Sequence, residues 1–192
     1  MAAIEGKRGL ERVAATAAEL SPGAAAAKAR GLPPVHLWNP ANVGEIDIVI
    51  RKDGTWVHEG GVIGREALVR LFSTILRRDP DGTWLVTPHE KLRIQVEDAA
   101  FVAVRVDRED DSLRFVTNVG DAVVAGPEHP IRVAGEPGGE PRPYVMVRAG
   151  LEALITRPVF YELVEFAEER DGELGLASGG AWFPLGAAEA EP

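Results

Sequence analysis

The sequence predicts an α+β fold made of two similar small modules, each a bent antiparallel sheet with one packed helix. Short strands with alternating apolar residues dominate the pattern, and two amphipathic helices each follow a hairpin. The order strand, strand, helix, turn, strand occurs twice along the chain. At 192 residues, with 45% hydrophobic and 27% charged residues, the chain has ordinary globular composition and can form two small cores.

The first module begins where apolar and polar residues start to alternate. Ile46–Ile50 has the period of a half-buried strand, and Asp53-Gly54 is typical of a hairpin turn before the return strand 55–58. Apolar residues then recur at helical spacing over about 64–78, which predicts an amphipathic helix. Two further strands are expected at 83–87 and 92–96.

The second module contains more strands than the first. A second helix is expected at about 158–169, with Pro158 near its start. The segment Gly135–Pro141 is too rich in Gly and Pro to pack as a strand. Six short strands are expected before the helix, at 101–106, 113–117, 122–125, 131–133, 144–148 and 151–155.

The two helices stand in parallel contexts, which predicts an internal duplication that superposes 46–96 on 143–185. Arg65 precedes the first helix and Arg157 the second, and each helix ends near an Asp-Gly. Helix formers at 10–30, broken at Ser21, predict an N-terminal arm of loosely docked helices or partly disordered chain. The expected divisions are a helical arm at 1–31, modules at 32–98 and 99–186, and a frayed tail at 187–192.

Charge and composition exclude several classes of protein. The formal net charge is −9, and all of the excess lies in residues 99–192, which hold 8 Arg, no Lys and 17 Asp plus Glu. Such a field repels duplex nucleic acid. The absence of Cys excludes disulfides, thiolate metal sites and a Cys nucleophile. No apolar run reaches the length of a membrane span, so we expect a cytoplasmic protein without membrane contact.

No established catalytic or metal-binding motif is present. His58-Glu59 and His89-Glu90 are the two His-Glu pairs, but neighbours on a strand point to opposite faces and cannot easily share one metal ion. We therefore expect no metal, no cofactor and no catalytic residue. A small hydrolase or isomerase that uses one of these pairs stays open as an alternative.

Polar residues outside the repeats indicate a ligand site at the junction of the modules. His36, Trp38 and Asn39 lie on an extended, Pro-bounded segment and can stack or form hydrogen bonds. Arg65 at a helix start and Lys91 near a turn can converge on an anion. The expected ligand-binding residues are His36, Trp38, Asn39, His58, Glu59, Arg65, Glu90 and Lys91.

Several blocks of sequence resemble a bacterial family called domain of unknown function 1285. They include His36–Pro40, Asp53–Gly60, Leu85–Lys91 and Asn118–Asp121, and the resemblance extends over roughly residues 32–185. Ala100 departs from it, because Pro is expected before Phe101. The resemblance implies two similar modules, the second loosely like a pleckstrin-homology fold, with no established catalytic activity.

The resemblance also implies a small, nucleotide-like ligand between the modules and a role in signalling. Together with the missing motifs, it favours a non-catalytic ligand-binding or sensory protein with a small anionic or nucleotide-like ligand. A protein-interaction module that uses the open sheet of the second half is a further alternative.

Overall fold

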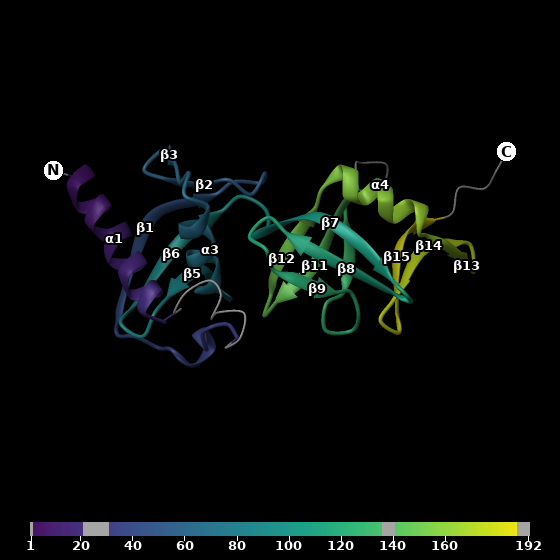
Figure 1. Cartoon of the computed structure of the whole chain (residues 1–192), viewed down its shortest axis with the longest axis horizontal. Coiled ribbons are helices and arrows are strands. Elements are labelled where there is room, and N and C mark those ends of the chain that lie inside the picture. Colours follow the sequence, from purple (N-terminus) through teal and green to yellow (C-terminus); the bar gives the residue numbers. More distant parts are fainter. Residues whose placement is uncertain (1, 21–30, 136–140, 188–192) are drawn as a thin grey trace. The chain divides into compact units, whose positions relative to one another are not determined.

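The chain folds into two compact units, Met1–Asp98 and Ala99–Pro192. The computed structural model describes residues 2–20, 31–135 and 141–187, and only the backbone of residues 2–8 and 187. Figure 1 shows helices α1 and α3 with a curled sheet in the first unit, and two sheets with helix α4 in the second. The expected tail beyond 187, most of the Gly/Pro-rich segment and the helix after Ser21 lie outside the described residues.

The N-terminal unit is built on one six-stranded sheet with the order β3-β2-β1-β6-β5-β4. All neighbouring strands are antiparallel except the central pair, because β1 and β6 run parallel. The elements are α1 (Ala2–Leu20), the 3-10 turn η1 (Val35–Leu37), β1 (Asn42–Ile50), β2 (Trp56–His58), β3 (Gly61–Val62), α3 (Glu66–Thr74), β4 (Leu76–Asp79), β5 (Gly82–Val86) and β6 (Glu90–Val96).

An irregularity in β1 separates two stretches of its pairing with β6. Glu45 lies opposite Arg93 and Val49 opposite Gln95. Between these two pairs β1 therefore contains two more residues than β6. Such bulges bend a strand and redirect its side chains. The bend lies beside the pocket described below.

The core of this unit lies on the face of the sheet that α3 and α1 cover. Trp56 from β2 stacks on Phe72 from α3, with ring centroids 6.2 Å apart, and both side chains are buried. The N-terminal helix packs against α3 and β1, and it buries Val13 and Ala17. The expected loose arm is therefore a docked helix over the part of it that the structure describes.

The C-terminal unit contains a six-stranded sheet and a separate three-stranded one. The larger sheet has the order β10-β11-β12-β7-β8-β9, with β7 and β12 parallel at its centre. Its elements are β7 (Phe101–Glu109), β8 (Ser112–Thr117), β9 (Ala122–Val124), β10 (Ile131–Ala134), β11 (Arg142–Arg148), β12 (Leu151–Ile155) and α4 (Arg157–Glu165); the smaller sheet holds β13 (Glu168–Arg170), β14 (Glu173–Ser178) and β15 (Ala181–Ala187).

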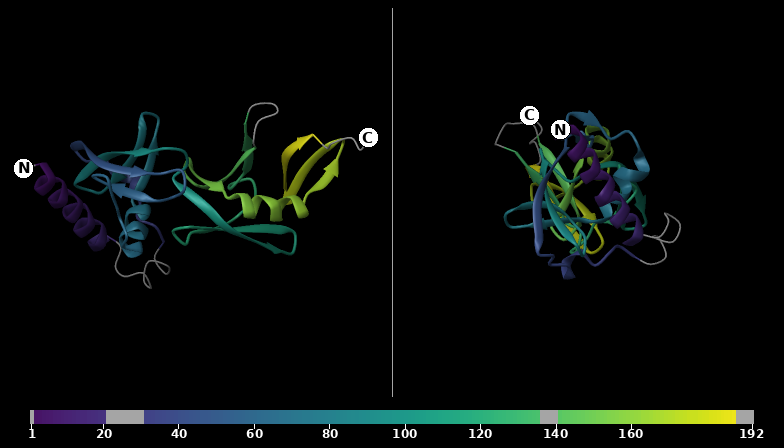
Figure 2. Two further views of the ribbon diagram at one scale, coloured as in Figure 1. Left: turned by 90° about the horizontal axis from the view of Figure 1, so that it is seen from above. Right: turned by 90° about the vertical axis from the view of Figure 1, so that its left-hand side faces the viewer.

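The two six-stranded sheets share one topology, and the two-module α+β fold is confirmed. If the strands of each are numbered from its N-terminal end, both read 3-2-1-6-5-4, with the first and last strands parallel. The sheets are thus mixed, where purely antiparallel ones were expected. Figure 2 shows the sheet of each unit from two further directions.

The two helices do not occupy equivalent places, so the expected superposition of 46–96 on 143–185 is wrong in register. Helix α3 connects the third and fourth strands of its sheet, whereas α4 follows the sixth strand of its own. The strands that follow α4 form the separate small sheet, which the sequence pattern did not predict. The similarity of the modules lies in strand order, and a local strand–strand–helix pattern cannot reveal it.

Both helices end earlier than the sequence pattern predicts. Residues 76–79 belong to β4, where Leu76 pairs with Leu85 and Arg77 with Trp84 on opposite faces of the sheet. Four residues are too few to distinguish the two-residue period of a strand from the continuation of a helical apolar stripe. Arg77 and Arg78, which fall within the range expected for the first helix, are therefore strand residues.

Ser178 joins the small sheet of the C-terminal unit to the large one. Its buried hydroxyl donates to the carbonyl of Ala125 and accepts from the amide of Leu113, both at 2.8 Å. The amide of Gly179 donates to the carbonyl of Asp111 at 3.2 Å. A single side chain thus satisfies two buried backbone groups from the larger sheet.

We predict that Ser178→Ala destabilises the C-terminal unit by about 1–3 kcal/mol, because it leaves the Leu113 amide and the Ala125 carbonyl without that partner. Urea denaturation followed by circular dichroism measures the change. Ser112→Ala, on the neighbouring strand β8, is the matched control and should shift the midpoint little. Equal effects of the two variants would contradict this role of Ser178.

Candidate functional site

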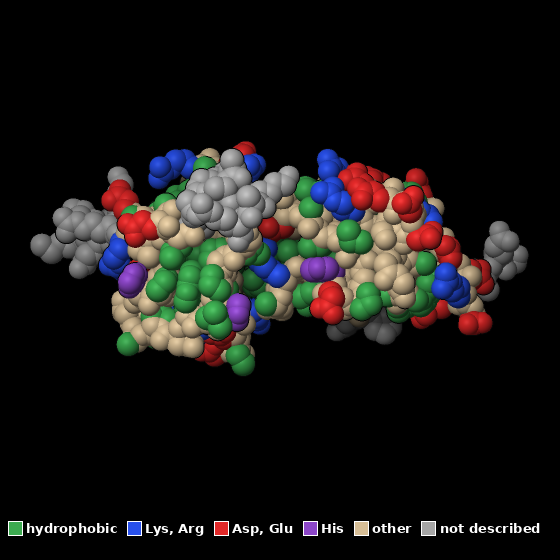
Figure 3. Space-filling view, turned by 60° about the horizontal axis from the view of Figure 1, so that its bottom comes forward, with side chains coloured by type: hydrophobic (Ala, Val, Ile, Leu, Met, Phe, Trp, Pro, Cys, Tyr) green, Lys and Arg blue, Asp and Glu red, His purple; other side chains and the backbone are tan. Residues whose placement is uncertain are grey.

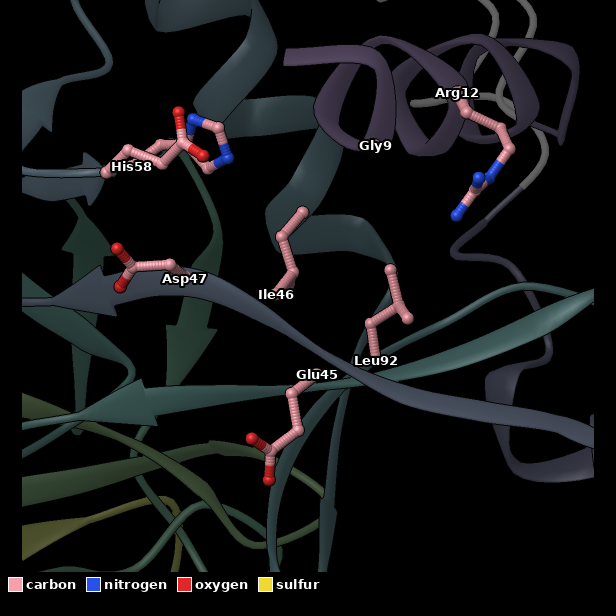
Figure 4. A pocket seen from close by; sticks show the side chains of 8 residues that line it. Gly9, Arg12, Glu45, Ile46, Asp47, His58 and Leu92 are labelled. Atoms are coloured by element: carbon pink, nitrogen blue, oxygen red, sulfur yellow. The ribbon is translucent and has the colours of Figure 1, made fainter. Parts of the chain in front are cut away.

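A pocket of about 370 Å³ lies in the N-terminal unit beneath α1. Figure 4 shows that Ile46 from β1 and Leu92 from β6 rise toward the helix, whereas Glu45 points to the other side of β1. The floor is therefore apolar. The lining residues are Gly9 and Arg12 of α1, Glu45, Ile46 and Asp47 of β1, His58 and Glu59 at the end of β2, and Leu92 of β6.

His58 forms one side of this pocket. It lies opposite Ile48 in the β1–β2 ladder, and its imidazole is half-buried. Its Nε2 atom is buried and has no hydrogen-bond partner among the described residues, and the same holds for Nε1 of Trp56 two residues earlier. A buried polar atom without a partner is costly, and such atoms in native proteins often indicate a ligand or ordered water.

Glu90 begins β6 beside the pocket and is a buried carboxylate. Arg12 holds it with two hydrogen bonds, from Nε to Oε1 at 3.2 Å and from Nη2 to Oε2 at 2.8 Å. The Glu90 side chain is 4% exposed and the Arg12 side chain 62% exposed. The hydrogen bonds and negative charge of Glu90 raise the pKa of Arg12 above its ordinary value. This ion pair fastens α1 to the sheet.

Three of the expected ligand residues lie on or next to η1, away from the pocket lining. His36 and Asn39 are exposed, and Trp38 is half-buried. Arg77 fixes this turn, because its Nη1 donates to the carbonyls of Val35 at 3.0 Å and Trp38 at 2.7 Å. These contacts give the segment a definite conformation.

Lys91 and Arg65 do not line the pocket either. The Nζ atom of Lys91 lies 2.7 Å from Oδ2 of Asp79 and 4.0 Å from the centre of the Trp84 ring. Arg65 is exposed at the N-cap of α3. Of the eight expected residues, the structure therefore brings together His58 and Glu59 at the pocket, with Glu90 joined to it through Arg12.

Asp79 stands at the centre of a small ion network on the opposite face of the sheet. Its carboxylate accepts from Arg77 Nε at 2.9 Å and from Lys91. Burial raises the pKa of Asp79, but the hydrogen bonds and charges of Arg77 and Lys91 outweigh burial, so the pKa lies below its ordinary value. The network links β4, β6 and, through Arg77, the turn η1.

Six residues of the pocket lining were not expected from the sequence: Gly9, Arg12, Glu45, Ile46, Asp47 and Leu92. Ile46 and Leu92 were visible as apolar strand residues, and only their position under α1 makes them a pocket floor. Arg12 carried no signal, because its partner Glu90 lies far along the chain. Among the described residues, no group of three or more His, Asp or Glu side chains is arranged to hold a metal ion, and no helix is long and apolar enough to cross a bilayer.

The fold and this pocket define a two-domain α+β protein whose N-terminal domain carries a small-molecule-sized cavity. Two family models match successive parts of the chain: the N-terminal domain of DUF1285, a domain of unknown function, at residues 33–99, and the C-terminal domain of DUF1285 at residues 100–185. The chain therefore belongs to the DUF1285 family. No curated protein matches it.

Two crystal structures of DUF1285 family proteins are similar to this chain. The protein from Silicibacter pomeroyi DSS-3 is 53% identical, with a TM-score of 0.78 over 86% of this chain and 94% of that one. The protein from Shewanella baltica OS155 is 27% identical, with a TM-score of 0.51 over 62% of this chain and 90% of that one.

We predict that Asp79→Asn destabilises the N-terminal unit by about 2 kcal/mol at pH 7, since it removes a charged acceptor from two cations. The depressed pKa of Asp79 means that the unfolded chain binds its proton more readily. The stabilisation is thus complete above the unfolded pKa of about 3.9 and is lost as the pH falls through the lower folded value.

Urea denaturation between pH 7 and pH 3 tests this prediction. Tryptophan fluorescence is a suitable signal, because three of the four tryptophans, Trp38, Trp56 and Trp84, lie in the N-terminal unit. The difference between wild type and variant should shrink at the acid end. A difference that stays constant with pH, or one that the exposed-turn control Asp111→Asn reproduces, would argue against the network.

Proposed function

We propose that the protein is a non-catalytic binding protein for a small ligand, which it holds in the pocket between α1, β1, β2 and β6. The observation that carries this proposal is the buried Nε2 of His58, a pocket-lining side chain without a hydrogen-bond partner among the described residues. An unpaired polar atom of this kind costs about 1–3 kcal/mol. A ligand hydroxyl, carbonyl or amine recovers that energy when the imidazole turns to present Nε2 to the pocket.

The residues that line the pocket indicate which class of ligand would fit it. Ile46 and Leu92 offer an apolar floor, which suits a ligand with a hydrocarbon or ring portion. The carboxylates of Asp47 and Glu59 border the pocket, while the guanidinium of Arg12 is engaged by Glu90. Two carboxylates and no unpaired cation among the described lining residues favour a neutral or cationic ligand. The anionic or nucleotide-like ligand expected from the sequence stays a prediction.

The absence of an oriented acid–base pair supports a non-catalytic role. A general base needs a group that orients it within hydrogen-bond distance. In the part of the chain that the structure describes, no hydrogen bond joins His58 to Glu59 or His89 to Glu90. Glu90 is turned toward Arg12, and His89 is exposed. The hydrolase or isomerase alternative has no geometric support from these contacts.

A protein-interaction module has one supporting observation. Figure 3 shows hydrophobic side chains on one face of the N-terminal unit, not on the sheet of the second half that the sequence pointed to. In the same unit Leu32, Leu37 and Val43 are 47%, 68% and 57% exposed. Nothing in the structure shows what covers them, so ligand binding is the better-supported function. A site at the junction of the modules, a signalling role and a cytoplasmic location stay predictions from the sequence.

We predict that His58→Phe abolishes binding or weakens it at least tenfold, because it keeps the ring volume and removes the hydrogen bond, and tenfold corresponds to about 1.4 kcal/mol. A thermal-shift screen of small neutral and cationic metabolites identifies binders, and calorimetry measures their dissociation constants. His36→Phe is the matched control, because His36 is exposed and outside the pocket. A screen without binders, or equal affinity in both variants, would overturn the proposal.

A further inference from the structure

Helix α1 forms a wall of the pocket, and its described side chains, residues 9–20, make a thin apolar contact in which Leu10 and Leu20 are only half-buried. It contributes Gly9 and Arg12 to the lining, so the pocket exists only while the helix is docked. In residues 9–20 only Val13 and Ala17 are buried, and both side chains are small. Helix α3, in contrast, anchors itself in the core with the fully buried Phe72.

The polar attachment of α1 lies at the boundary with solvent. Arg12 and Glu90 form the ion pair that fastens the helix, and the Arg12 side chain is 62% exposed. Water can therefore reach the guanidinium and replace it at the carboxylate. Glu90 stands at the first residue of β6, at the end of the strand, where water can replace the guanidinium as its partner.

The rest of the N-terminal unit is complete without the helix. All six strands of its sheet and helix α3 lie between residues 42 and 96. The family model for this domain begins at residue 33, after α1. The sheet and α3 are therefore built entirely from residues that follow α1 in the chain.

We infer that α1 is a removable cover of the pocket, which opens without global unfolding and is held closed by a bound ligand. The opening is a sub-global event of the kind that thin, small-residue interfaces allow. The coupling follows because the docked helix is part of the binding site, and a ligand shifts the equilibrium toward the state it binds better. The ligand-dependent part rests on the proposed function, whereas the opening itself does not.

The absence of Cys from the chain gives a direct test of opening. Leu92→Cys places a unique thiol in the pocket floor beneath α1, and Ile94→Cys places one at a similarly buried position two residues along β6, outside the lining. The rate of reaction with 5,5′-dithiobis(2-nitrobenzoate) is measured for both, together with the free energy of global unfolding. We expect Leu92→Cys to react at least tenfold faster than global unfolding allows, and Ile94→Cys to react only at that limit.

Loss of the ion pair should release the helix. Arg12→Ala in the Leu92→Cys background should raise the labelling rate at least fivefold, and should leave Ile94→Cys at its unfolding limit. Arg70→Ala is the matched control, because Arg70 is also an exposed helical arginine in an ion pair, with Glu66 on α3. It should change neither rate beyond its effect on global stability.

The outcomes separate this inference from the proposed function. If both thiols react only through global unfolding, or if Arg12→Ala and Arg70→Ala act alike, the removable cover is wrong even when a ligand is found. If the cover opens and no metabolite in the screen binds, the proposed function fails and the opening stands. A compound that calorimetry shows to bind the Leu92→Cys variant itself, but that leaves its labelling rate unchanged at saturation, contradicts the coupling.

Discussion

The parallel pairing of the first and last strands is the constraint on which each module depends. In the N-terminal unit β1 pairs with β6, and in the C-terminal unit β7 pairs with β12, at the centre of each sheet. The other strands extend outward from these pairs as antiparallel meanders. Closing such a long-range pair loses more chain entropy than closing a local hairpin does. Burial of the core must offset this loss.

The site follows from that pairing. Because β6 lies next to β1, Leu92 comes beside Ile46, and Glu90 at the start of β6 meets Arg12. The irregularity of β1 lies between Glu45 and Val49, where the floor of the pocket begins. His58 lies on β2, where it pairs with Ile48 of β1, and lines the pocket from the other side of β1.

The sequence predicts the elements of the fold better than their arrangement. Alternation and turn residues identify most of the strands, such as those around Ile48 and Leu154, because period and turn chemistry are local. Strand order is set by contacts between distant segments, which a local pattern does not contain. Two hairpins that are each followed by a helix therefore suggested equivalent positions for α3 and α4, which the two sheets do not give them. The site shows the same limit: His58 and Glu59 could be singled out by type, but Arg12 matters only through Glu90, which no spacing rule connects to it.

The strand order has a consequence for the chain as it is synthesised. The last strand of each six-stranded sheet lies at its centre, so a chain interrupted before residue 90 lacks the middle of the first sheet and not an edge. Until β6 has been synthesised, one edge of β1 has unpaired backbone N–H and C=O groups beside the apolar residues Ile48 and Ile50. Such an edge promotes aggregation. Each six-stranded sheet is therefore closed only when translation has passed its sixth strand.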